Sequence, residues 1–294
     1  MTYSFGTIRE AYAKASSFLA EAGVRDPGAN AELLLQHVLG ADRTAFLLAL
    51  GDPFPEDKRE AWLLALQRKA AGEPVQYIIG EQEFYGLAFT VTPAVLIPRP
   101  ETELLVEAVI RYGRQLFPQR APSAVDIGTG SGAIPVTLAV ECPDWTICSS
   151  DISEAALKVA AANAGRHGVA ERVELLQGDL LEPHLKRGTA IDILVSNPPY
   201  IPSREVEELQ PEVKSHEPRS ALDGGEDGLD LYRRMAAQMQ RLPRYPRLVG
   251  FEVGQGQARE VGSLLEQQRA WDRVFYVKDL AGIERHVLAL REHD

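Results

Sequence analysis

Apolar residues in positions 1–72 recur every three or four residues, the spacing that gives an α-helix one buried face. Turn and capping residues interrupt this pattern, and acidic residues precede basic ones along the last expected helix, in the order that suits the helix dipole. The expected boundaries fall at Gly23, Asp26-Pro27, Gly40, Asp42, Pro55 and Gly72. The pattern predicts a small N-terminal helical bundle domain over residues 1–72.

Residues 73–97 follow a different pattern. Two runs rich in β-branched and aromatic residues, YIIGEQEF and LAFTV, flank the dipeptide Tyr85-Gly86. Strand-like runs on both sides of a two-residue turn are typical of a β-hairpin. We therefore expect a linker with a β-hairpin over residues 73–97.

From Pro122 onward, apolar runs of strand length alternate with helical patterns. The expected strands are SAVDIG, TICSSD, RVELLQ, AIDILVSN, RLVGFEV, RVFYVKD and RHVLALR. This alternation predicts an α/β domain over residues 98–294, in which helices cover both faces of a mostly parallel, seven-stranded sheet. Only Leu280 to Glu284 joins the last two strands, which is too short for a crossover helix, so the last strand is expected to be antiparallel.

Composition and charge narrow the class of protein. Hydrophobic residues make up 45% of the 294 positions, enough for packed cores, and 31 basic against 42 acidic residues give a formal charge of −11. That sign disfavours a general surface for duplex nucleic acid. Cys142 and Cys148 match neither a disulfide framework nor a zinc signature, and we find no secretory leader or membrane-spanning run. We expect a cytoplasmic protein.

The first strand of the α/β domain runs into the glycine-rich stretch DIGTGSGAI. Gly128, Gly130 and Gly132 permit a tight turn and let a ligand approach bare backbone just before a helix. The spacing differs from the dinucleotide fingerprint, and Asp126 would be unfavourable beside a pyrophosphate. A cationic or zwitterionic ligand is the better interpretation; an ordinary strand-to-helix turn is the alternative.

Two aspartates follow the next two strands. Asp151 is placed to accept hydrogen bonds from ribose hydroxyls, and Asp179 to accept one from an adenine amino group while Leu180 packs beside the ring. Either aspartate alone is more often a helix cap or a turn residue. With Asp126 and Asn197, however, they fall at the carboxyl ends of successive strands, where open α/β sheets bind ligands.

The stretch DILVSNPPYIPS ends the fourth expected strand with Asn197, Pro198, Pro199 and Tyr200. Each proline fixes its own φ and lacks a backbone N–H, so the turn is rigid and presents carbonyl oxygens without competing donors. An isolated Asn-Pro-Pro segment is most often just a turn. Its position in line with the upstream polar residues favours a catalytic interpretation.

In this order, Asp126, the glycine turn, Asp151, Asp179 and the Asn-Pro-Pro-Tyr segment resemble the motifs of class I S-adenosylmethionine-dependent methyltransferases. The resemblance narrows with IPRPETELLVE, HEPRSALDGGEDGLDLYR, FEVGQGQ and the helical N-terminal domain. Together these features resemble the release factor glutamine methyltransferases, which methylate the glutamine of the Gly-Gly-Gln loop in bacterial peptide chain release factors. The resemblance covers nearly the whole chain.

The resemblance implies a Rossmann-like methyltransferase fold, S-adenosylmethionine as cofactor, and a release factor as partner, docked in part on the N-terminal helices. The cofactor is expected to contact Gly128, Thr129, Gly130, Ser131, Gly132, Asp151, Asp179, Leu180 and Asn197. The substrate is expected to contact Asn197, Pro198, Pro199 and Tyr200, with Asn197, Pro198 and Tyr200 taking part in catalysis.

The chemistry of an amide substrate agrees with these roles. An amide nitrogen is a poor nucleophile because its lone pair is delocalised into the carbonyl. If the Asn197 side-chain oxygen and the Pro198 carbonyl each accept one N–H, they orient the nitrogen and stabilise the positive charge that develops on it. The Tyr200 ring suits a flat amide or a sulfonium. This chemistry needs neither a metal nor a covalent nucleophile, and none is expected.

Several other residues keep two interpretations. Arg99 and Glu101 either help to close the cofactor pocket or begin a helix. Glu252 either supports the Asn197 loop or makes a structural hydrogen bond, and His216 is either a base or, more plainly, a surface residue. The glycine-rich stretch 224–228 is either a flexible lid or an ordinary long connection.

Two alternative functions remain open from the sequence. A nucleic-acid methyltransferase acting on adenine or guanine amino groups shares the Asn-Pro-Pro-Tyr segment, but the charge of −11 and the lack of an inserted basic domain disfavour it. A scaffold that keeps the cofactor fold without turnover is the other alternative, and the intact turn at Asn197 argues against it.

Overall fold

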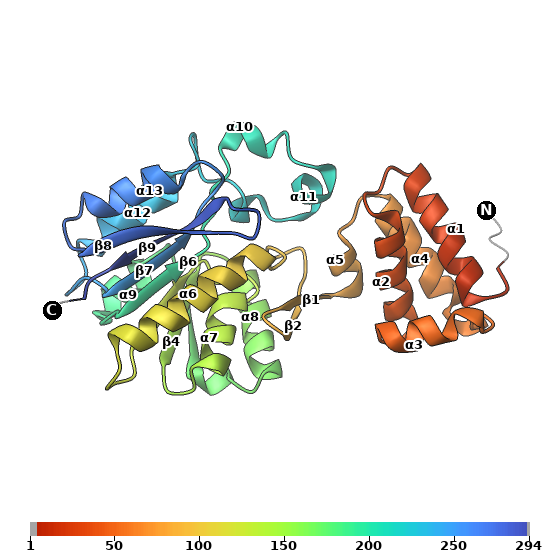
Figure 1. The fold of residues 1–294 in the computed structure, drawn as a ribbon, viewed down its shortest axis with the longest axis horizontal. Coiled ribbons are helices and arrows are strands. Elements are labelled where there is room, and N and C mark those ends of the chain that lie inside the picture. The colour runs from red at the N-terminus through yellow and green to blue at the C-terminus, as the bar shows by residue number, and fades with distance from the viewer. Residues whose placement is uncertain (1–4, 293–294) are drawn as a thin grey trace. The chain divides into compact units, whose positions relative to one another are not determined.

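The computed structural model describes residues 5–292; residues 1–4 and 293–294, at the outer ends of the expected first and last domains, lie outside the described part of the chain. The chain divides into two compact units. The first contains the residues up to Glu81 together with Gln210–His216, and the second contains Gln82–Leu209 and the residues from Glu217 onward. Figure 1 shows the helices of residues 5–81 in red and orange and the later segment, Gln210–His216, in teal.

The first unit is the expected helical bundle, and its capping residues act as predicted. The Asp42 carboxylate accepts a hydrogen bond from the Ala45 backbone N–H at 2.8 Å, and Gly40 ends its helix in the left-handed conformation. The elements are α1 Ile8–Glu21, α2 Pro27–Leu39, α3 Arg43–Leu48, the 3-10 turns Ala49–Gly51 and Glu56–Lys58, α4 Arg59–Ala70 and α5 Val75–Ile79.

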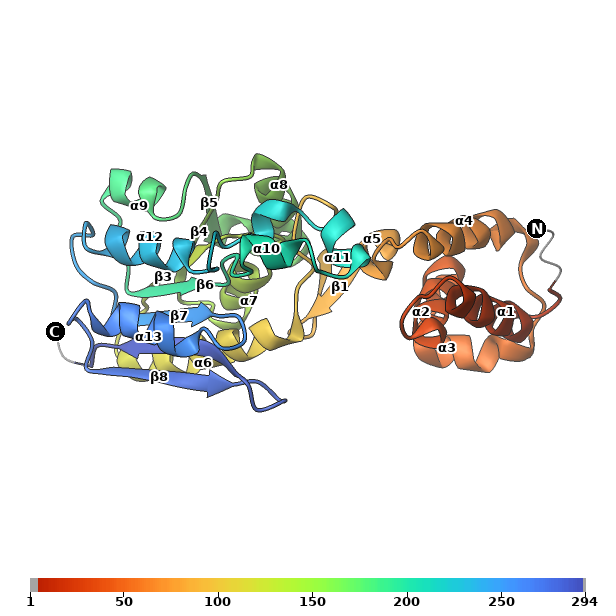
Figure 2. The same ribbon diagram turned by 90° about the horizontal axis from the view of Figure 1, so that it is seen from above.

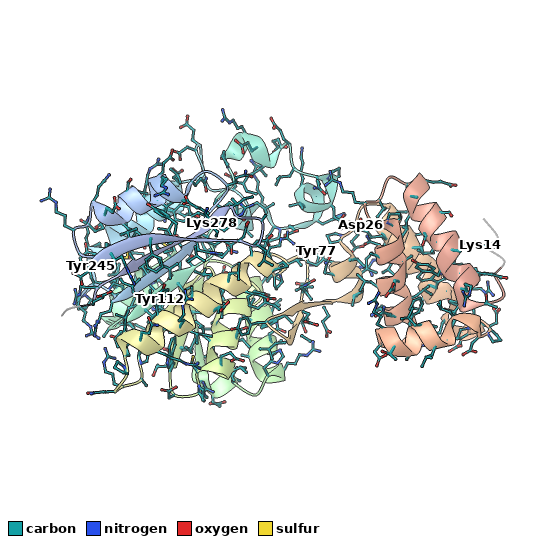
Figure 3. All side chains as sticks on the ribbon, in the orientation of Figure 1. Lys14, Asp26, Tyr77, Tyr112, Tyr245 and Lys278 are labelled. Carbon is teal, nitrogen blue, oxygen red and sulfur yellow. The ribbon has the colours of Figure 1, made fainter. Side chains whose placement is uncertain are left out.

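Two boundaries differ from the sequence prediction. The helix expected from Pro55 begins with a separate 3-10 turn, and its α-helical part starts only at Arg59. The start of the YIIGEQEF run is helical, because Val75 and Ile78 pack into the bundle core and Gly80 then stops the helix at φ +83°. Burial in the bundle therefore overrides the β propensity of Tyr77–Ile79, whose tyrosine Figure 3 labels on α5. The expected linker 73–97 thus contributes a helix to the first unit and a hairpin to the second.

A buried lysine fastens a short later segment of the chain into the first unit. Lys69 is 1% exposed, and its Nζ donates to Glu212 Oε1 at 2.6 Å and to the Glu73 carbonyl at 3.0 Å. Glu212 belongs to α11, Pro211–His216. Since a buried ammonium needs charge-assisted partners, this pair fixes α11 within the helical unit.

In the second unit, residues within the described range form the seven-stranded sheet that the sequence predicts, with the order β5-β4-β3-β6-β7-β9-β8. Neighbouring strands are parallel except that β9 runs antiparallel to both β7 and β8, so the prediction for the last strand is confirmed. The strands are β3 Ser123–Ile127, β4 Thr146–Asp151, β5 Val173–Gln177, β6 Ile193–Ser196, β7 Leu248–Glu252, β8 Arg273–Lys278 and β9 Glu284–Leu290.

The predicted hairpin is also present. Strands β1, Glu81–Phe84, and β2, Leu87–Thr90, form a two-stranded sheet. Tyr85 and Gly86 both have positive φ, +53° and +72°, as a two-residue turn that follows the twist of its strands requires.

Helices cover both faces of the large sheet (Figures 1 and 2). One core lies beneath α6 Pro100–Leu116, α7 Ala133–Glu141 and α8 Glu154–Arg166. The other lies beneath α9 Glu182–Arg187, α12 Asp230–Met239 and α13 Ala258–Glu266. The connections carry α10 Ser203–Val206 and the 3-10 turns Ala170–Arg172 and Arg219–Ala221.

The strand order places the site. The chain runs outward from β3 through β4 to β5, then returns to add β6 and β7 on the other side of β3. The order therefore reverses between β3 and β6, and such a switch point opens a crevice at the carboxyl ends of the strands. Within the described residues, no single helix is long and apolar enough to cross a membrane; α2 and the segment Arg43–Gly51, bent by 99°, meet that length and composition only as a pair.

Candidate active site

A cavity of about 300 Å³ opens at this switch point, over the ends of β4, β3 and β6. Its lining includes most of the cofactor residues expected from the sequence: Gly128, Thr129, Gly130, Ser131, Asp151, Asp179, Leu180 and Asn197. Pro199 also lines it, whereas Gly132, Pro198 and Tyr200 do not. The expected residues are therefore gathered at one edge of the sheet, with three of them set back from the cavity.

The glycine turn exposes backbone to the cavity. Gly128 and Gly130 have φ of +83° and +54°, a region in which residues with a Cβ are strained. A Cβ at either position would lie 3.9 to 4.0 Å from its nearest neighbouring atom, so conformation, and not crowding, requires glycine here. Gly132 has a different role, because it is the N-cap residue of α7 and a Cβ there would lie only 3.1 Å from the Ala160 Cβ of α8.

Asp151 is both a turn residue and a wall of the cavity. Its Oδ2 accepts from the Gly130 backbone N–H at 2.9 Å, and its Oδ1 accepts from the Ser153 N–H at 2.8 Å. The Ser153 hydroxyl caps α8. The carboxylate is thus fixed from both sides, and each oxygen retains a lone pair for a ligand hydroxyl.

Asp126 lies behind the glycine turn and does not line the cavity. It is 1% exposed, and its Oδ2 accepts a hydrogen bond from the Ser149 hydroxyl at 2.6 Å. The Ser149 and Thr129 hydroxyl oxygens are also hydrogen-bonded, at 2.6 Å. Burial, and the nearby Asp151 charge to a lesser degree, raise the pKa of Asp126 to about 7. Asp126 therefore braces Thr129 from inside the sheet.

Asp179 and Leu180 form the wall after β5. Asp179 is half-exposed and makes an ion pair with Arg234, another lining residue. Leu180 adopts φ +50°, a strained conformation for a branched side chain, and the Ser150 hydroxyl holds it by donating to the Leu180 carbonyl at 2.9 Å. The same cavity also has an apolar part. Ile152 lines it and is 65% exposed, so it offers an apolar surface to a flat ring.

The Asn-Pro-Pro-Tyr turn presents two acceptors. The Asn197 Nδ2 donates to the Thr102 hydroxyl at 3.1 Å, which directs its Oδ1 elsewhere. Within the described residues, neither Asn197 Oδ1 nor the Pro198 carbonyl accepts a hydrogen bond. Tyr200 lines a separate depression with Ile201 and Gln257, and burial raises its pKa, so the phenol is neutral.

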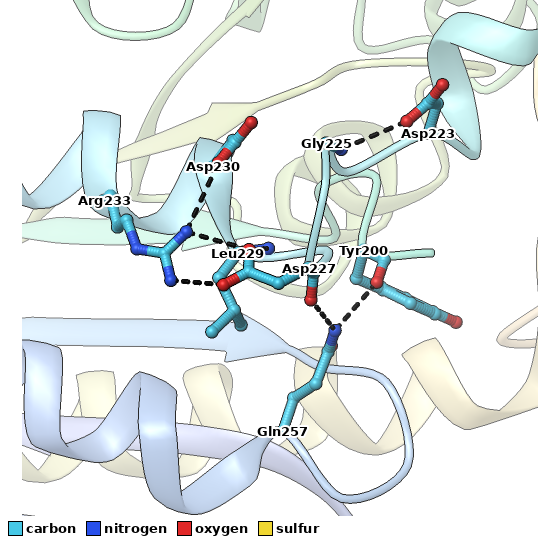
Figure 4. Close-up of polar contacts among 8 residues, drawn as sticks. All are labelled: Tyr200, Asp223, Gly225, Asp227, Leu229, Asp230, Arg233 and Gln257. Carbon is cyan, nitrogen blue, oxygen red and sulfur yellow. Dashed lines mark hydrogen bonds and ion pairs between the residues drawn. The ribbon is translucent and has the colours of Figure 1, made fainter. Parts of the chain in front are cut away.

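The glycine-rich stretch 224–228, a lid or an ordinary connection by its sequence, is packed directly against this turn (Figure 4). A Cβ at Gly224 would lie 2.8 Å from the Pro199 carbonyl oxygen, and one at Gly228 would lie 2.3 Å from the Tyr200 carbonyl oxygen. The Gly224 N–H donates to the Ile201 carbonyl at 2.8 Å. The stretch therefore buttresses the turn, and glycine is needed because two backbones touch.

Gln257 joins a third segment to the same turn. Its Nε2 donates to the Tyr200 carbonyl at 2.9 Å, and its Oε1 accepts from the Gly254 N–H at 2.9 Å. The neighbouring Asp227 pairs with Arg233 at 2.5 Å (Figure 4). The FEVGQGQ motif thus supports the acceptor turn from outside.

Arg99 and Thr102 line the cavity from the start of α6. Arg99 pairs with the buried Glu217 at 2.5 Å, and Thr102 donates to the buried Glu252 at 2.6 Å. Glu101 is exposed. Arg99 and Glu252 were candidates from the sequence, whereas Thr102 and Glu217 were not. The only signal for these two was their place in the IPRPETE and HEPR stretches.

His216, weighed from the sequence as a base, ends α11 in the first unit and is not part of the cavity lining. Within residues 5–292, no group of three or more His, Cys, Asp or Glu side chains gathers in a way that would hold a metal ion.

The cavity fits S-adenosylmethionine. Bare glycine backbone, an anchored carboxylate at the ribose position and an apolar platform at Ile152 match an amino acid joined to a nucleoside. Together with the sheet order, these features define a class I S-adenosylmethionine-dependent methyltransferase.

Comparison with known families narrows this class. Residues 10–80 match the family model of the PrmC N-terminal domain, and residues 102–213 match that of the methyltransferase small domain. The release factor glutamine methyltransferase of Bacillus subtilis is 43% identical over 97% of this chain and 98% of its own length. Those of Moorella thermoacetica and Bacillus cereus are 43% and 41% identical, over 98% and 97% of this chain and 100% and 99% of their own. The chain belongs to the release factor glutamine methyltransferase family, and it is an enzyme that uses S-adenosylmethionine.

Solved structures share the fold at low sequence identity. The human METTL16 catalytic domain in complex with the MAT2A 3'UTR hairpin 6 has a TM-score of 0.56 at 16% identity, covering 83% of this chain and 86% of that one. The N-terminal domain of human METTL16 in complex with SAH has a TM-score of 0.52 at 16% identity, covering 95% of both chains. At this identity the likeness concerns the fold alone.

Proposed function

We propose that this chain methylates the side-chain amide nitrogen of the glutamine in the Gly-Gly-Gln loop of peptide chain release factors. The observation that carries the proposal is a pair of hydrogen-bond acceptors beside the cofactor cavity, Asn197 Oδ1 and the Pro198 carbonyl. Neither of them accepts a hydrogen bond within the described residues. A primary amide has two N–H groups, so two fixed acceptors match it. The names of its full-length relatives support the same substrate.

The cofactor supplies an electrophilic methyl group when it is bound. In this proposal Gly128, Gly130 and Asp151 hold its amino-acid and ribose parts, while Leu180 and Ile152 lie on either side of the adenine. Asp179, which pairs with Arg234, accepts a hydrogen bond from the adenine amino group.

The chain's contribution to rate is mostly positioning. Fixing the amide nitrogen in line with the methyl group is worth roughly 7–11 kcal/mol, whereas one preorganised acceptor is worth about 3–4 kcal/mol. The two prolines keep both acceptors in place, because each proline ring fixes its own φ, and neither proline nitrogen has a hydrogen that competes for an acceptor. Tyr200 contributes through its ring, since a neutral phenol in this environment neither gives up nor takes a proton near neutral pH.

We propose that the helical domain docks the release factor, which would explain selection of one protein over any exposed glutamine. The support is an excess of exposed leucines on its helices: Leu33, Leu47, Leu48 and Leu64 are 43%, 49%, 82% and 55% exposed. Exposed apolar side chains that lie together are typical of a contact surface, and Leu47 and Leu48 are neighbours on α3. Leu48→Glu is expected to raise the KM for whole release factor, while Leu280→Glu, at a 97% exposed leucine of the other unit, leaves it unchanged.

The deciding experiment is methyl transfer from labelled S-adenosylmethionine to purified release factor, beside the factor's own Gln→Ala loop variant and a nucleic-acid control. Label on the unaltered factor alone supports the proposal. Label on nucleic acid would keep the fold and replace the function, whereas cofactor binding without any label would favour the scaffold. Since release factors work on the ribosome, the proposed substrate also places the enzyme in the cytoplasm, with no nucleic-acid substrate of its own.

A further inference from the structure

An asparagine amide has two different ends, and only one of them suits a glutamine substrate. The Asn197 oxygen can accept an N–H, whereas its NH₂ group would meet the substrate NH₂ as donor against donor. We propose that Glu252, acting through the Thr102 hydroxyl, fixes the Asn197 amide with its oxygen toward the substrate. This assignment rests on the proposed function and adds Thr102 and Glu252 to it as positioning residues.

The three side chains form a continuous chain of hydrogen bonds. Asn197 Nδ2 donates to Thr102 Oγ1 at 3.1 Å, and Thr102 Oγ1 donates to Glu252 Oε2 at 2.6 Å. Thr102 is 4% and Glu252 2% exposed, so the two inner members have little access to water as an alternative partner. Such a buried chain has a defined direction, because each hydroxyl has a single hydrogen to give.

The direction of the chain follows from the charge at its inner end. An ionised carboxylate can only accept, so Thr102 must spend its hydrogen on Glu252. The Thr102 oxygen is then free only to accept, and the group that Asn197 turns toward it must be the NH₂. The Asn197 oxygen consequently points to the opposite side, where no described hydrogen bond claims it.

Protonating Glu252 removes this constraint. A carboxylic acid can donate to Thr102, whose own hydrogen then becomes available to Asn197. Both orientations of the amide are then satisfied, and one of them presents NH₂ to the substrate. The same three residues therefore hold the active orientation firmly only while Glu252 is charged.

The fold brings these residues together from separate parts of the chain. Asn197 follows β6, Glu252 ends the neighbouring β7, and the two strands pair through Ser196 and Phe251. Thr102 comes from the first turn of α6. It is separated in the chain by 95 residues from Asn197 and by 150 residues from Glu252. A local structural hydrogen bond would not need three remote elements to converge.

Several groups face Glu252 from the surrounding elements: Glu101 of α6, Tyr200 after β6, Tyr232 of α12, and Arg285 and His286 of β9. The Tyr232 hydroxyl donates to the Glu252 backbone carbonyl at 2.6 Å, and His286 Nε2 is 4.0 Å from Glu252 Oε2. Burial lowers the pKa of His286 to about 4, so this histidine is neutral near pH 7. Burial raises the pKa of Glu252 to about 7, against the opposing effect of the Thr102 hydrogen bond.

The first test compares Thr102→Val, which keeps the shape and removes the hydroxyl, with Thr102→Ser, which keeps the hydroxyl. Thr102→Val is expected to lower kcat about 10-fold or more while changing the affinity for S-adenosylhomocysteine far less, and Thr102→Ser to recover most of the loss in kcat. Thr137→Val is the matched control, because Thr137 is buried and its hydroxyl has no hydrogen-bond partner among the described residues. A kcat for Thr102→Val within about twofold of the unaltered enzyme would overturn the proposal.

The second test is the pH profile. Between about pH 6 and 8, kcat should rise with the ionisation of Glu252, and Glu252→Gln should lower kcat and flatten this rise. A purely structural Glu252 would change stability but leave the shape of the profile intact. Persistence of the same rise in Glu252→Gln therefore contradicts the relay.

The third readout needs no turnover. In the free, isotope-labelled protein, the side-chain NH₂ resonance of Asn197, assigned by its loss in Asn197→Ala, should shift with pH near neutrality. The shift should disappear in Glu252→Gln and persist in Asp126→Asn, which removes the other buried acid with a pKa of about 7. Absence of the shift in the unaltered protein would overturn the relay, whereas absence of release-factor methylation alone would overturn only the proposed function.

Discussion

Two turns meet at the cofactor cavity, and they are built in opposite ways. The turn after β3 is local: its glycines are neighbours in the chain, and Asp151 and Asp126 come from the same pair of strands. The turn after β6 consists of prolines, and α6, the glycine stretch 224–228 and the start of α13 hold it from three sides. A turn that binds a ligand through its backbone needs conformational freedom, which a short run of glycines provides. A turn that orients two hydrogen-bond acceptors needs rigidity, which contacts with remote segments provide.

The largest expected effect on kcat comes from removing one of the two oriented hydrogen-bond acceptors, the Asn197 side chain. Asn197→Ala should lower kcat about 10²–10³-fold, in line with the loss of one preorganised hydrogen-bonding group. Affinity for S-adenosylhomocysteine, measured by calorimetry, should change far less, because the glycine turn and Asp151 are untouched. A variant that loses cofactor binding in parallel with kcat would show that the two turns do not divide their tasks.

The next effect tests the remote support of the second turn. In Gly224→Ala the new Cβ would lie 2.8 Å from the backbone of both Pro199 and Tyr200, so the turn has to move. A displacement of that kind is expected to lower kcat about 10–100-fold in single-turnover measurements. Gly165→Ala, in α8 with no atom within 4 Å of the added carbon, is the control and should leave kcat unchanged.

A smaller effect is expected at the first turn. Gly130→Ala places a side chain at φ +54°, a strain of about 1–2 kcal/mol, and so should weaken S-adenosylhomocysteine binding about 5–30-fold. Gly188→Ala carries a similar strain at φ +64° in open space away from the cavity. If both variants bind the cofactor analogue equally, strain in the turn does not control affinity.

The smallest effect concerns stability. Burial raises the pKa of both Glu252 and Asp126 to about 7 from ordinary values of 4.5 and 3.8. Between those values and pH 7 the folded state holds protons that the unfolded state has released, so each carboxyl makes the free energy of unfolding fall as pH rises through this window. At pH 8, where the cost is complete, Glu252→Gln and Asp126→Asn should each raise the free energy of unfolding by roughly 1–3 kcal/mol.

Urea unfolding at pH 5 and pH 8 checks this prediction. The gain should be clear at the higher pH and much smaller at the lower one, where the native carboxyls are already mostly protonated. Glu252→Gln would then be more stable and less active than the unaltered enzyme. This is the stability–activity trade-off expected for a functional charge that is buried away from water. If the variants and the unaltered protein have equal free energies of unfolding at both pH values, ionisation of these carboxyls does not destabilise the folded state.

The same contrast explains what the sequence revealed. Helix ends, strands, the hairpin at Tyr85-Gly86 and the strand-end residues Asp151, Asp179 and Asn197 were predictable because neighbouring residues determine them. The helical state of Tyr77–Ile79 was not, because packing in the bundle decides it against local propensity.

The support of the second turn was equally hidden. Thr102 reads as an ordinary first-turn helix residue, and Gly224 and Gly228 read as a flexible loop until their closeness to Pro199 and Tyr200 is known. Alternation of strands and helices gives the sheet edge, but it does not say which side chain from α6 reaches that edge. Contacts that span 95 or 150 residues leave no local pattern in the chain.

The pairing of Lys69 with Glu212 has a consequence for how such an enzyme is inherited. The chain leaves the helical unit after Glu81, returns to it for Gln210–His216, and leaves it again, so no single cut separates the two units. A gene fragment encoding residues 82–294 would carry α11 without Lys69, and one encoding residues 1–81 would leave that buried lysine without the Glu212 carboxylate. We therefore expect recombination between relatives to exchange Lys69 and Glu212 together.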